Sequence, residues 1–279
     1  MSVDPDGDGS FRAGDGTVLA YRRVGSGPVL VCLPGGPLQD GAYLGDLGGL
    51  SAHRQLIVAG LRGSGRYALP LDPACCRCDR LVDDVERLRR HLDLDRFDVL
   101  AHSAGTNLAL LYAQHHPERL AKLALIAPSP AAVGLTVSSE DRRAVAQLRR
   151  GEPWFAAAAT ALEAVLAGEV TPEVEQAIAP FRYGRWDETA RAQHAAWGQR
   201  DDAAALAFAA PGAFDPARTR AALARSSASV LVLAGEVDVN SPPRMVSELA
   251  GLSAPPGSAS NPEPVTCRGW TTPRSSFVS

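Results

Sequence analysis

The sequence lacks the marks of a membrane protein and of a nucleic-acid-binding protein. No part of its 279 residues forms an apolar run approaching the roughly 20 residues that a transmembrane helix needs. The net charge of −3 provides no attraction to nucleic acid or to an anionic membrane surface. The opening residues Met1–Asp6 are acidic, unlike a signal peptide. We therefore expect a soluble, cytoplasmic protein, and its oligomeric state stays open.

Cysteine is scarce and shows no disulfide framework. The five cysteines, an odd number, are Cys32, Cys75, Cys76, Cys78 and Cys267. Without framework spacing, reduced thiols in a cytosolic protein are expected. Three of them cluster at 75–78, but no second group of ligands follows at the spacing of a zinc site. The sequence therefore predicts no metal centre.

Apolar runs alternate with amphipathic stretches through most of the chain. Strands are predicted at residues 17–24, 28–33, 54–59, 97–102, 120–126 and 229–234. Helices are predicted after residue 105 and within 79–92, 218–224 and 244–252. Residues 1–16, rich in glycine and aspartate, are expected to be frayed at the start. The alternation predicts an α/β fold with a mostly parallel sheet and helices on both faces.

The middle of the chain breaks this alternation. From residue 130 to about 215, helical patterns follow one another with no strand between them. Because this all-helical insertion follows a sheet strand, we expect it to cap the carboxyl ends of the strands. The predicted organisation is a core over 1–129 and 216–252, a helical cap over 130–215 and an irregular tail over 253–279.

One serine lies between a predicted strand and a predicted helix. Ser103 follows the strand 97–102, and Ala101, Ala104 and Gly105 are its small neighbours. A tight turn here would strain the serine backbone and expose its hydroxyl at the end of the sheet. The following helix N-terminus favours developing negative charge. Ser103 is therefore the candidate nucleophile, and an ordinary strand–helix turn is the alternative.

Two other loops at the same sheet edge supply candidate partners for this serine. The glycines of Pro34–Pro37 let the backbone approach a tetrahedral intermediate, so Gly36 and Ala104 are the expected oxyanion-hole donors. Asp238 follows the last predicted strand and is the candidate acid that orients a histidine, with Glu236 as its competitor. The alternative for Asp238 is a loop aspartate that caps the next helix.

These motifs resemble those of the α/β-hydrolases of the proline iminopeptidase-like group. The resemblance covers roughly residues 10–252 and rests on Val31–Pro37, Arg62–Arg66, Ala101–Gly105 and Gly235–Pro243. It implies the α/β-hydrolase fold, Ser103 as nucleophile, Asp238 as acid, and Gly36 with Ala104 as oxyanion hole. It also implies a helical cap over an acyl-transfer pocket and no cofactor. Pro34 replaces the family's usual histidine and Gly60 its common aspartate, which blurs the substrate assignment.

The most serious departure is a missing catalytic histidine. The resemblance implies a histidine on a loop after an eighth strand, in a pattern like Gly-His-x-Pro-Trp, yet none follows Asp238. His194, in the predicted cap, is the one conceivable substitute. The remaining histidines are His53, His91, His102, His115 and His116. We expect the final strand and helix of the fold to be missing as well.

A shifted reading frame would account for this absence. Residues 253–279 show no periodicity and are rich in Ser, Pro and Thr. Lys122 is the only lysine, and the abundance of Arg, Ala, Gly and Pro indicates a GC-rich coding sequence. With such codons, residues 264–273 read one frame over can give Gly-His-Leu-Pro-Trp-Leu-Asp-Asp-Pro. We therefore interpret the tail as frameshifted and expect impaired hydrolysis and low solubility.

The predicted function is acyl transfer to water, of the aminopeptidase or esterase kind, on a small molecule or short peptide. The candidate substrate-binding residues are Trp154, Phe181, Tyr183 and Trp186, which could instead form the core of the cap. Glu163 or Asp187 could bind a substrate amine, or could be solvated surface charges. The alternative function is a non-catalytic ligand-binding relic on the same fold.

Overall fold

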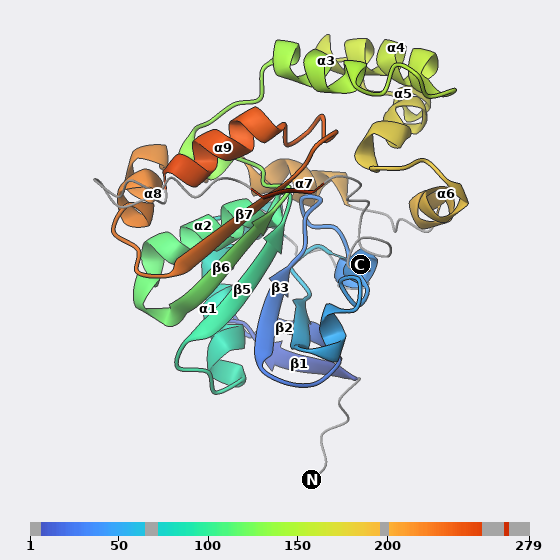
Figure 1. The fold of residues 1–279 in the computed structure, drawn as a ribbon. Helices are drawn as coiled ribbons and strands as arrows, with labels where there is room; N and C mark the ends of the chain where they lie inside the picture. Colours follow the sequence, from blue (N-terminus) through green and yellow to red (C-terminus); the bar gives the residue numbers. More distant parts are fainter. Residues whose placement is uncertain (1–6, 65–71, 196–200, 253–264, 268–279) are drawn as a thin grey trace.

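An eight-stranded sheet forms the centre of the computed structural model, which describes residues 7–64, 72–195, 201–252 and 265–267 (Figure 1). The strands are β1 (Asp8–Arg12), β2 (Val18–Val24), β3 (Val29–Leu33), β4 (Gln55–Ala59), β5 (Phe97–His102), β6 (Leu120–Ile126), β7 (Ser229–Gly235) and β8 (Val265–Cys267). Their spatial order is β1-β2-β4-β3-β5-β6-β7-β8. The pairs β1–β2 and β2–β4 are antiparallel, and all the others are parallel. The predicted α/β fold with a mostly parallel sheet is confirmed.

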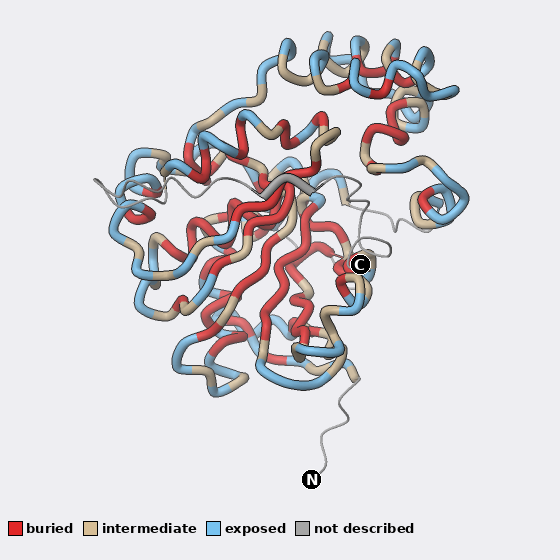
Figure 2. Tube along the Cα trace, viewed as in Figure 1, coloured by how far each residue is buried: buried red, intermediate tan, exposed pale blue. Residues whose placement is uncertain are grey.

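The two faces of the sheet are covered differently. One face packs against the helices α1 (Leu81–His91), α2 (Gly105–His115), α8 (Pro216–Leu223) and α9 (Pro243–Gly251), whose apolar residues join the main core. The opposite face is covered by the segment that contains the 3-10 helices η1 (Gly41–Leu44) and η2 (Leu50–Ala52). Figure 2 shows the central strands buried along most of their length. No helix within the described ranges is both long and apolar enough to cross a lipid bilayer.

Three helices of the predicted cap form a layer above the carboxyl ends of the strands (Figure 1). They are α3 (Ser139–Gln147), α4 (Phe155–Leu166) and α5 (Pro172–Ile178), and α6 (Glu188–Ala195) follows them. Ala146, Leu162 and Phe181 belong to an apolar cluster of their own, which the loop after β7 joins through Val239. This layer is therefore packed separately from the sheet.

The last helix of the predicted cap packs with the core instead. Ala204 and Phe208 of α7 (Asp202–Phe208) belong to the main apolar core. The backbone N–H of Cys78 donates a hydrogen bond of 3.0 Å to the Phe208 carbonyl. Residues 130–215 thus contain one group of helices over the strand ends and one helix held against the core.

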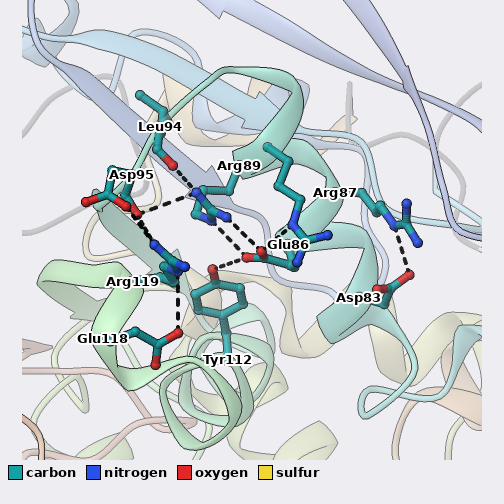
Figure 3. A network of polar contacts seen from close by, with 10 residues as sticks. Asp83, Glu86, Arg87, Arg89, Leu94, Asp95, Tyr112, Glu118 and Arg119 are labelled. Carbon is teal, nitrogen blue, oxygen red and sulfur yellow. Dashed lines mark hydrogen bonds and ion pairs between the residues drawn. The ribbon is translucent and has the colours of Figure 1, made fainter.

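Buried ion pairs connect the elements on the main-core face. Glu86 of α1 accepts hydrogen bonds from the Tyr112 hydroxyl of α2 at 2.7 Å and from Arg89 at 2.7 and 2.9 Å (Figure 3). Arg89 also donates to the Leu94 carbonyl in the loop before β5. These contacts fix α1, α2 and the entrance to β5 relative to one another.

The Arg62–Arg66 turn contributes a second buried ion pair. Arg62 donates to Asp84 of α1 at 2.6 Å and to Asp15, in the β1–β2 loop, at 2.5 Å. These contacts hold the pKa of the Asp15 carboxyl well below its usual range. The last two residues of the turn lie outside the described residues.

Both ends of the sheet differ from the sequence-based expectation. Residues 8–12, within the segment expected to be frayed, form β1, because β2 offers an edge and Phe11 is buried against the core. The final strand, expected to be missing, is present over three residues, where β8 pairs with Leu233–Gly235 of β7. The open edge of β7 favours this pairing. The expectations for residues 253–264 and 268–279, including the missing final helix, lie outside the described residues.

Candidate active site

Ser103 occupies a strained turn between β5 and α2. Its φ of 50° lies in the left-handed region, which costs a residue with a side chain about 1–3 kcal/mol. The turn is held from both sides, because the Ser103 N–H donates to the Ile126 carbonyl at 3.0 Å and its carbonyl accepts the N–H of Ser129 at 3.1 Å. The backbone therefore has the strained strand–turn–helix geometry that the sequence pattern predicts around this serine.

Two glycines allow the surrounding backbone to approach this turn. A Cβ atom on Gly105 would lie 2.4 Å from the Pro34 carbonyl oxygen and 2.6 Å from that of Leu33. A Cβ atom on Gly35 would lie 2.8 Å from the Cβ of Ser103. Since real Cβ contacts are not this short, only glycine lets α2 and the 34–37 loop pack so closely around the serine.

Buried polar side chains after the serine stabilise the turn. The Thr106 hydroxyl donates to the Ser103 carbonyl at 2.6 Å. The Asn107 amide nitrogen donates to the Ser129 hydroxyl at 3.1 Å, and its oxygen accepts the Ala132 N–H at 2.9 Å. No sequence motif singled out these residues, although two polar residues at the start of a mostly apolar helix are a usable signal.

A cavity of about 900 Å³ brings the predicted catalytic residues together. Ser103, Asp238, Gly36 and Ala104 all line it, although they come from three separate loops or turns. Glu236, the competitor of Asp238, is not among its lining residues. The cavity lies at the carboxyl ends of the strands, where open parallel sheets bind ligands.

The predicted substrate-binding residues divide into two groups. Phe181 and Tyr183 line the cavity. Trp154 and Trp186 are not among its lining residues, because each packs behind one of these rings. Trp154 stands edge-on to Phe181, with ring centroids 5.3 Å apart, and Trp186 lies 5.3 Å from Tyr183. The ring contacts of Trp154 and Trp186 therefore agree with the alternative, that these residues form the core of the cap.

The expected oxyanion-hole donors, Gly36 and Ala104, both line the cavity. The Ala104 N–H makes no hydrogen bond to any residue that the structure describes, and it precedes α2, so the helix dipole adds positive potential. The Gly35 N–H is excluded as the second donor because it donates to the Tyr43 hydroxyl at 2.7 Å. Pro37 has no N–H, which leaves Gly36 as the candidate in this loop.

Tyr43 connects the glycine loop to the serine turn. Its hydroxyl accepts the Gly35 N–H and lies 2.8 Å from Nδ1 of His102, the residue before the nucleophile. The hydroxyl and Nδ1 share one hydrogen bond, in which either group can be the donor, depending on the tautomer of the imidazole. Burial lowers the pKa of His102 to about 4, so this ring is neutral at pH 7. No residue of the sequence pattern pointed to Tyr43, because its partners are distant in the chain.

Asp238 lies in the exit loop of β7 with one of its carboxylate oxygens engaged. Oδ1 accepts the backbone N–H groups of Asn240 at 2.8 Å and Ser241 at 3.0 Å. Oδ2 has no hydrogen bond from the described residues. Burial raises the pKa of this carboxyl, and the two N–H groups and the nearby Arg142 oppose that rise. The carboxylate thus has one oxygen available for a further donor.

Two of the six histidines, His102 and His194, line the cavity. His194 of α6 packs edge-on to Tyr183 and Trp186, at centroid distances of 6.0 and 5.7 Å. The Ser103 hydroxyl makes no hydrogen bond to either ring or to any other residue within the described ranges. A serine hydroxyl and a carboxylate therefore share this cavity without an imidazole that bridges them.

The residues predicted to bind a substrate amine lie elsewhere. Glu163 of α4 is half exposed and forms two hydrogen bonds of 2.7 Å with Arg143. Asp187 accepts the Ala190 N–H at 2.9 Å at the start of α6. Neither side chain is among the residues that line the cavity. The positions of Glu163 and Asp187 therefore agree with the alternative, that both are surface charges.

The family of the chain follows from its sequence match. A family model described as alpha/beta hydrolase fold matches residues 28–259. The chain therefore belongs to the α/β-hydrolase fold family, as the four motifs imply.

Within this family, the chain is similar to the proline iminopeptidase group. A proline iminopeptidase of Heyndrickxia coagulans is 32% identical over 108 residues, which cover 39% of this chain and 38% of that protein. The chain spans less than half the length of this and similar curated relatives. The solved structure of a proline iminopeptidase-related protein from Thermus thermophilus is 26% identical with a TM-score of 0.61, covering 87% of this chain and 85% of that one.

A more distant solved structure agrees with the fold. An esterase from Exiguobacterium antarcticum has a TM-score of 0.62 at 18% identity, over 86% of this chain and 85% of that chain. At this level of identity the similarity shows the shared fold.

Proposed function

We propose that this protein is a serine hydrolase that transfers small acyl groups to water through Ser103. The observation that carries the proposal is the left-handed backbone of Ser103 on a strand–helix turn, in one cavity with Asp238 and Gly36. The curated relatives named as proline iminopeptidases support this class of reaction. We also propose that the enzyme is cytoplasmic, acts on a small molecule or short peptide, and uses no cofactor.

In this mechanism Oγ of Ser103 attacks the substrate carbonyl carbon, and its proton passes to a base. The N–H groups of Ala104 and Gly36 stabilise the oxyanion, and the acyl group stays on Oγ when the leaving group departs. Water then attacks the acyl carbon and releases the acid, which regenerates the serine. Asp238 would orient a base and stabilise its positive charge.

We further propose that turnover by this sequence is low. No histidine follows Asp238, and Oδ2 of Asp238 has no imidazole donor within the described residues. Removing the histidine of a serine protease triad costs about 10⁶ in turnover, while the oxyanion hole and substrate binding retain about 10³–10⁴ over water. We propose the shifted reading frame after residue 253 as the origin of this loss.

The test compares this chain with one expressed from a gene shifted by one base from codon 253. We expect slow labelling of this chain by a fluorophosphonate and at least about 10⁴-fold faster labelling of the frame-shifted chain. Intact-mass analysis should place the label on Ser103, and Ser103→Ala should abolish it in both chains. Equal, fast labelling of both chains would show that this chain is not impaired. Labelling that survives Ser103→Ala would exclude Ser103 as nucleophile.

A non-catalytic binding protein is the second candidate function. The observation that favours it is the same lack of an imidazole between Ser103 and Asp238 in a cavity large enough for a ligand. Adding millimolar imidazole separates the two candidates, because an exogenous base can accept the serine proton in an enzyme that has lost its histidine. Faster fluorophosphonate labelling with imidazole supports the hydrolase, and no labelling under any condition supports the binding protein.

A further inference from the structure

One arginine of the cap faces the cavity that holds the candidate nucleophile. Arg142 lies in the first turn of α3, is half-buried and lines the same cavity as Ser103 and Asp238. Its neighbour Arg143 is half exposed, is not among the lining residues and forms an ion pair with Glu163. The two adjacent arginines therefore have different environments on one helix.

The guanidinium of Arg142 has no carboxylate partner at close range. Its one hydrogen bond is donated by Nη1 to the Asn240 side-chain oxygen at 3.3 Å. Among the described residues, no carboxylate oxygen lies within the 4.0 Å of an ion pair, and none of its nitrogens is a buried atom without a partner. Since a guanidinium carries five N–H donors in a planar fork, most of its donors remain accessible to a ligand.

The other charged groups of the cavity are engaged differently. Arg182 forms an ion pair with Glu175, so this cation is already neutralised. Asp238 directs one oxygen to two backbone N–H groups and contributes to Arg142 only through longer-range attraction. Asp202 and His194 also line the cavity. Among the described lining residues, Arg142 is thus the arginine that no carboxylate contacts directly.

We propose that Arg142 binds a carboxylate of the substrate, so that the preferred substrates are esters or amides that carry an anionic group near the scissile bond. This inference rests on the proposed hydrolase function and names its substrate class. A planar guanidinium and a carboxylate form two parallel charge-assisted hydrogen bonds, which fix both the position and the orientation of a ligand. Asn240 holds the guanidinium at the loop that carries Asp238, so the bound anion lies close to the catalytic loop.

Binding is tested first, in the chain with Ser103→Ala, because that measurement does not depend on turnover. The probes are phenylacetate and its neutral analogue phenylacetamide, titrated by NMR or calorimetry. We expect phenylacetate to bind at least about tenfold more tightly than phenylacetamide, with Arg142→Gln removing this difference. Arg143→Gln is the matched control on the same helix and should leave it unchanged.

A second variant and a rate measurement complete the test. Arg142→Lys keeps the charge without the planar fork, so it should retain part of the preference for phenylacetate over phenylacetamide. Retained binding by this variant would also show that the fold tolerates a substitution at this position. In the frame-shifted chain with Ser103 intact, Arg142→Gln should lower kcat/KM for p-nitrophenyl hemisuccinate relative to p-nitrophenyl acetate. Equal binding of both probes, or a preference that survives Arg142→Gln, overturns the proposal. If the frame-shifted chain binds phenylacetate but hydrolyses neither ester, only the proposed hydrolase function is contradicted.

Discussion

At the scale of single residues, the site depends on a hydroxyl that takes part in no bond change of the proposed reaction. Tyr43 joins the Gly35 N–H to His102, so one oxygen couples the oxyanion loop to the nucleophile turn. Burial raises the pKa of Tyr43 well above its usual range, which keeps this hydroxyl protonated and able to donate. We therefore propose that Tyr43 positions the expected oxyanion hole.

Tyr43→Phe should disturb this coupling without emptying the space that the ring fills. Two buried polar groups would lose their partner, so we expect the free energy of unfolding to fall by about 1–3 kcal/mol. Labelling of Ser103 should slow by about tenfold, because small displacements of aligned groups are costly. The pKa of His102, which burial lowers to about 4 in the native chain, should stay low in this variant because the phenyl ring keeps the imidazole buried, as followed by NMR titration.

Tyr21→Phe provides the control for this variant. The Tyr21 hydroxyl also contacts a histidine ring nitrogen, Nε2 of His91 at 3.3 Å, but on β2 and away from the cavity. The Tyr21→Phe substitution should lower the free energy of unfolding and leave the labelling rate of Ser103 unchanged. Equal labelling rates for the Tyr43→Phe and Tyr21→Phe chains would contradict the positioning role of Tyr43.

At the scale of elements, the position of α2 depends on a buried carboxylate of α1. Glu86 holds the Tyr112 hydroxyl of α2, while its ion pair with Arg89 extends to the loop before β5 (Figure 3). The hydrogen bonds from Arg89 lower the pKa of Glu86 most, and those from Tyr112 and Arg90 add to this effect. Since α2 begins just after Ser103, this contact supports the site from the far end of the helix.

Glu86→Gln should therefore destabilise the protein by about 2–4 kcal/mol at pH 7, because Arg89 would stay buried without its counter-ion. The folded pKa of Glu86 lies below its unfolded value of about 4.3. The stabilisation that the ionised Glu86 gives the folded chain is therefore complete above that pH and is lost as the pH falls from there through the lower folded pKa. The difference between the two chains in urea unfolding should shrink as the solution is made more acidic.

Asp83→Asn is the control on the same helix. Asp83 and Arg87 form an exposed pair at 3.5 Å, and such pairs contribute about 0–1 kcal/mol (Figure 3). We expect almost no change in the free energy of unfolding for the Asp83→Asn chain. If Glu86→Gln lowers the free energy of unfolding as little as Asp83→Asn does, the buried network does not stabilise the packing of α1 against α2.

At the scale of the whole molecule, the sheet has a partly open edge at β7. β8 pairs only with Leu233–Gly235, so within the described residues the outer edge of Ser229–Val232 has no strand partner. Leu231 lies in this part of β7 with 48% of its surface exposed. An apolar edge of this kind can pair with another molecule, which is the physical basis of the predicted low solubility.

Leu231→Lys should slow aggregation at 37 °C, measured by light scattering, because a charge on the edge opposes pairing between molecules. The free energy of unfolding should change by less than about 0.5 kcal/mol, since the side chain is already half exposed. Leu206→Lys is the control, because Leu206 is 79% exposed on α7 rather than on a strand. Equal slowing by both variants would assign aggregation to general surface hydrophobicity.

The local pattern of the sequence determined the elements and the serine turn. Apolar runs predicted β3 to β7 nearly residue for residue, because a buried parallel strand needs no polar face. Ser103 could be found because its requirement for small neighbours between strand and helix is met within five consecutive residues. The family resemblance of the four motifs was recognisable for the same reason.

Tertiary structure decided everything that depends on residues far apart in the chain. Local patterns cannot show that Tyr43 meets His102, that Asp238 rather than Glu236 lines the cavity, or that Arg142 faces inward while Arg143 faces Glu163. β1 and β8 formed because neighbouring strands offered them an edge, although their own sequences are weak. Propensity acts between neighbours in sequence, whereas the cavity, its charges and the sheet edges arise from packing between distant segments.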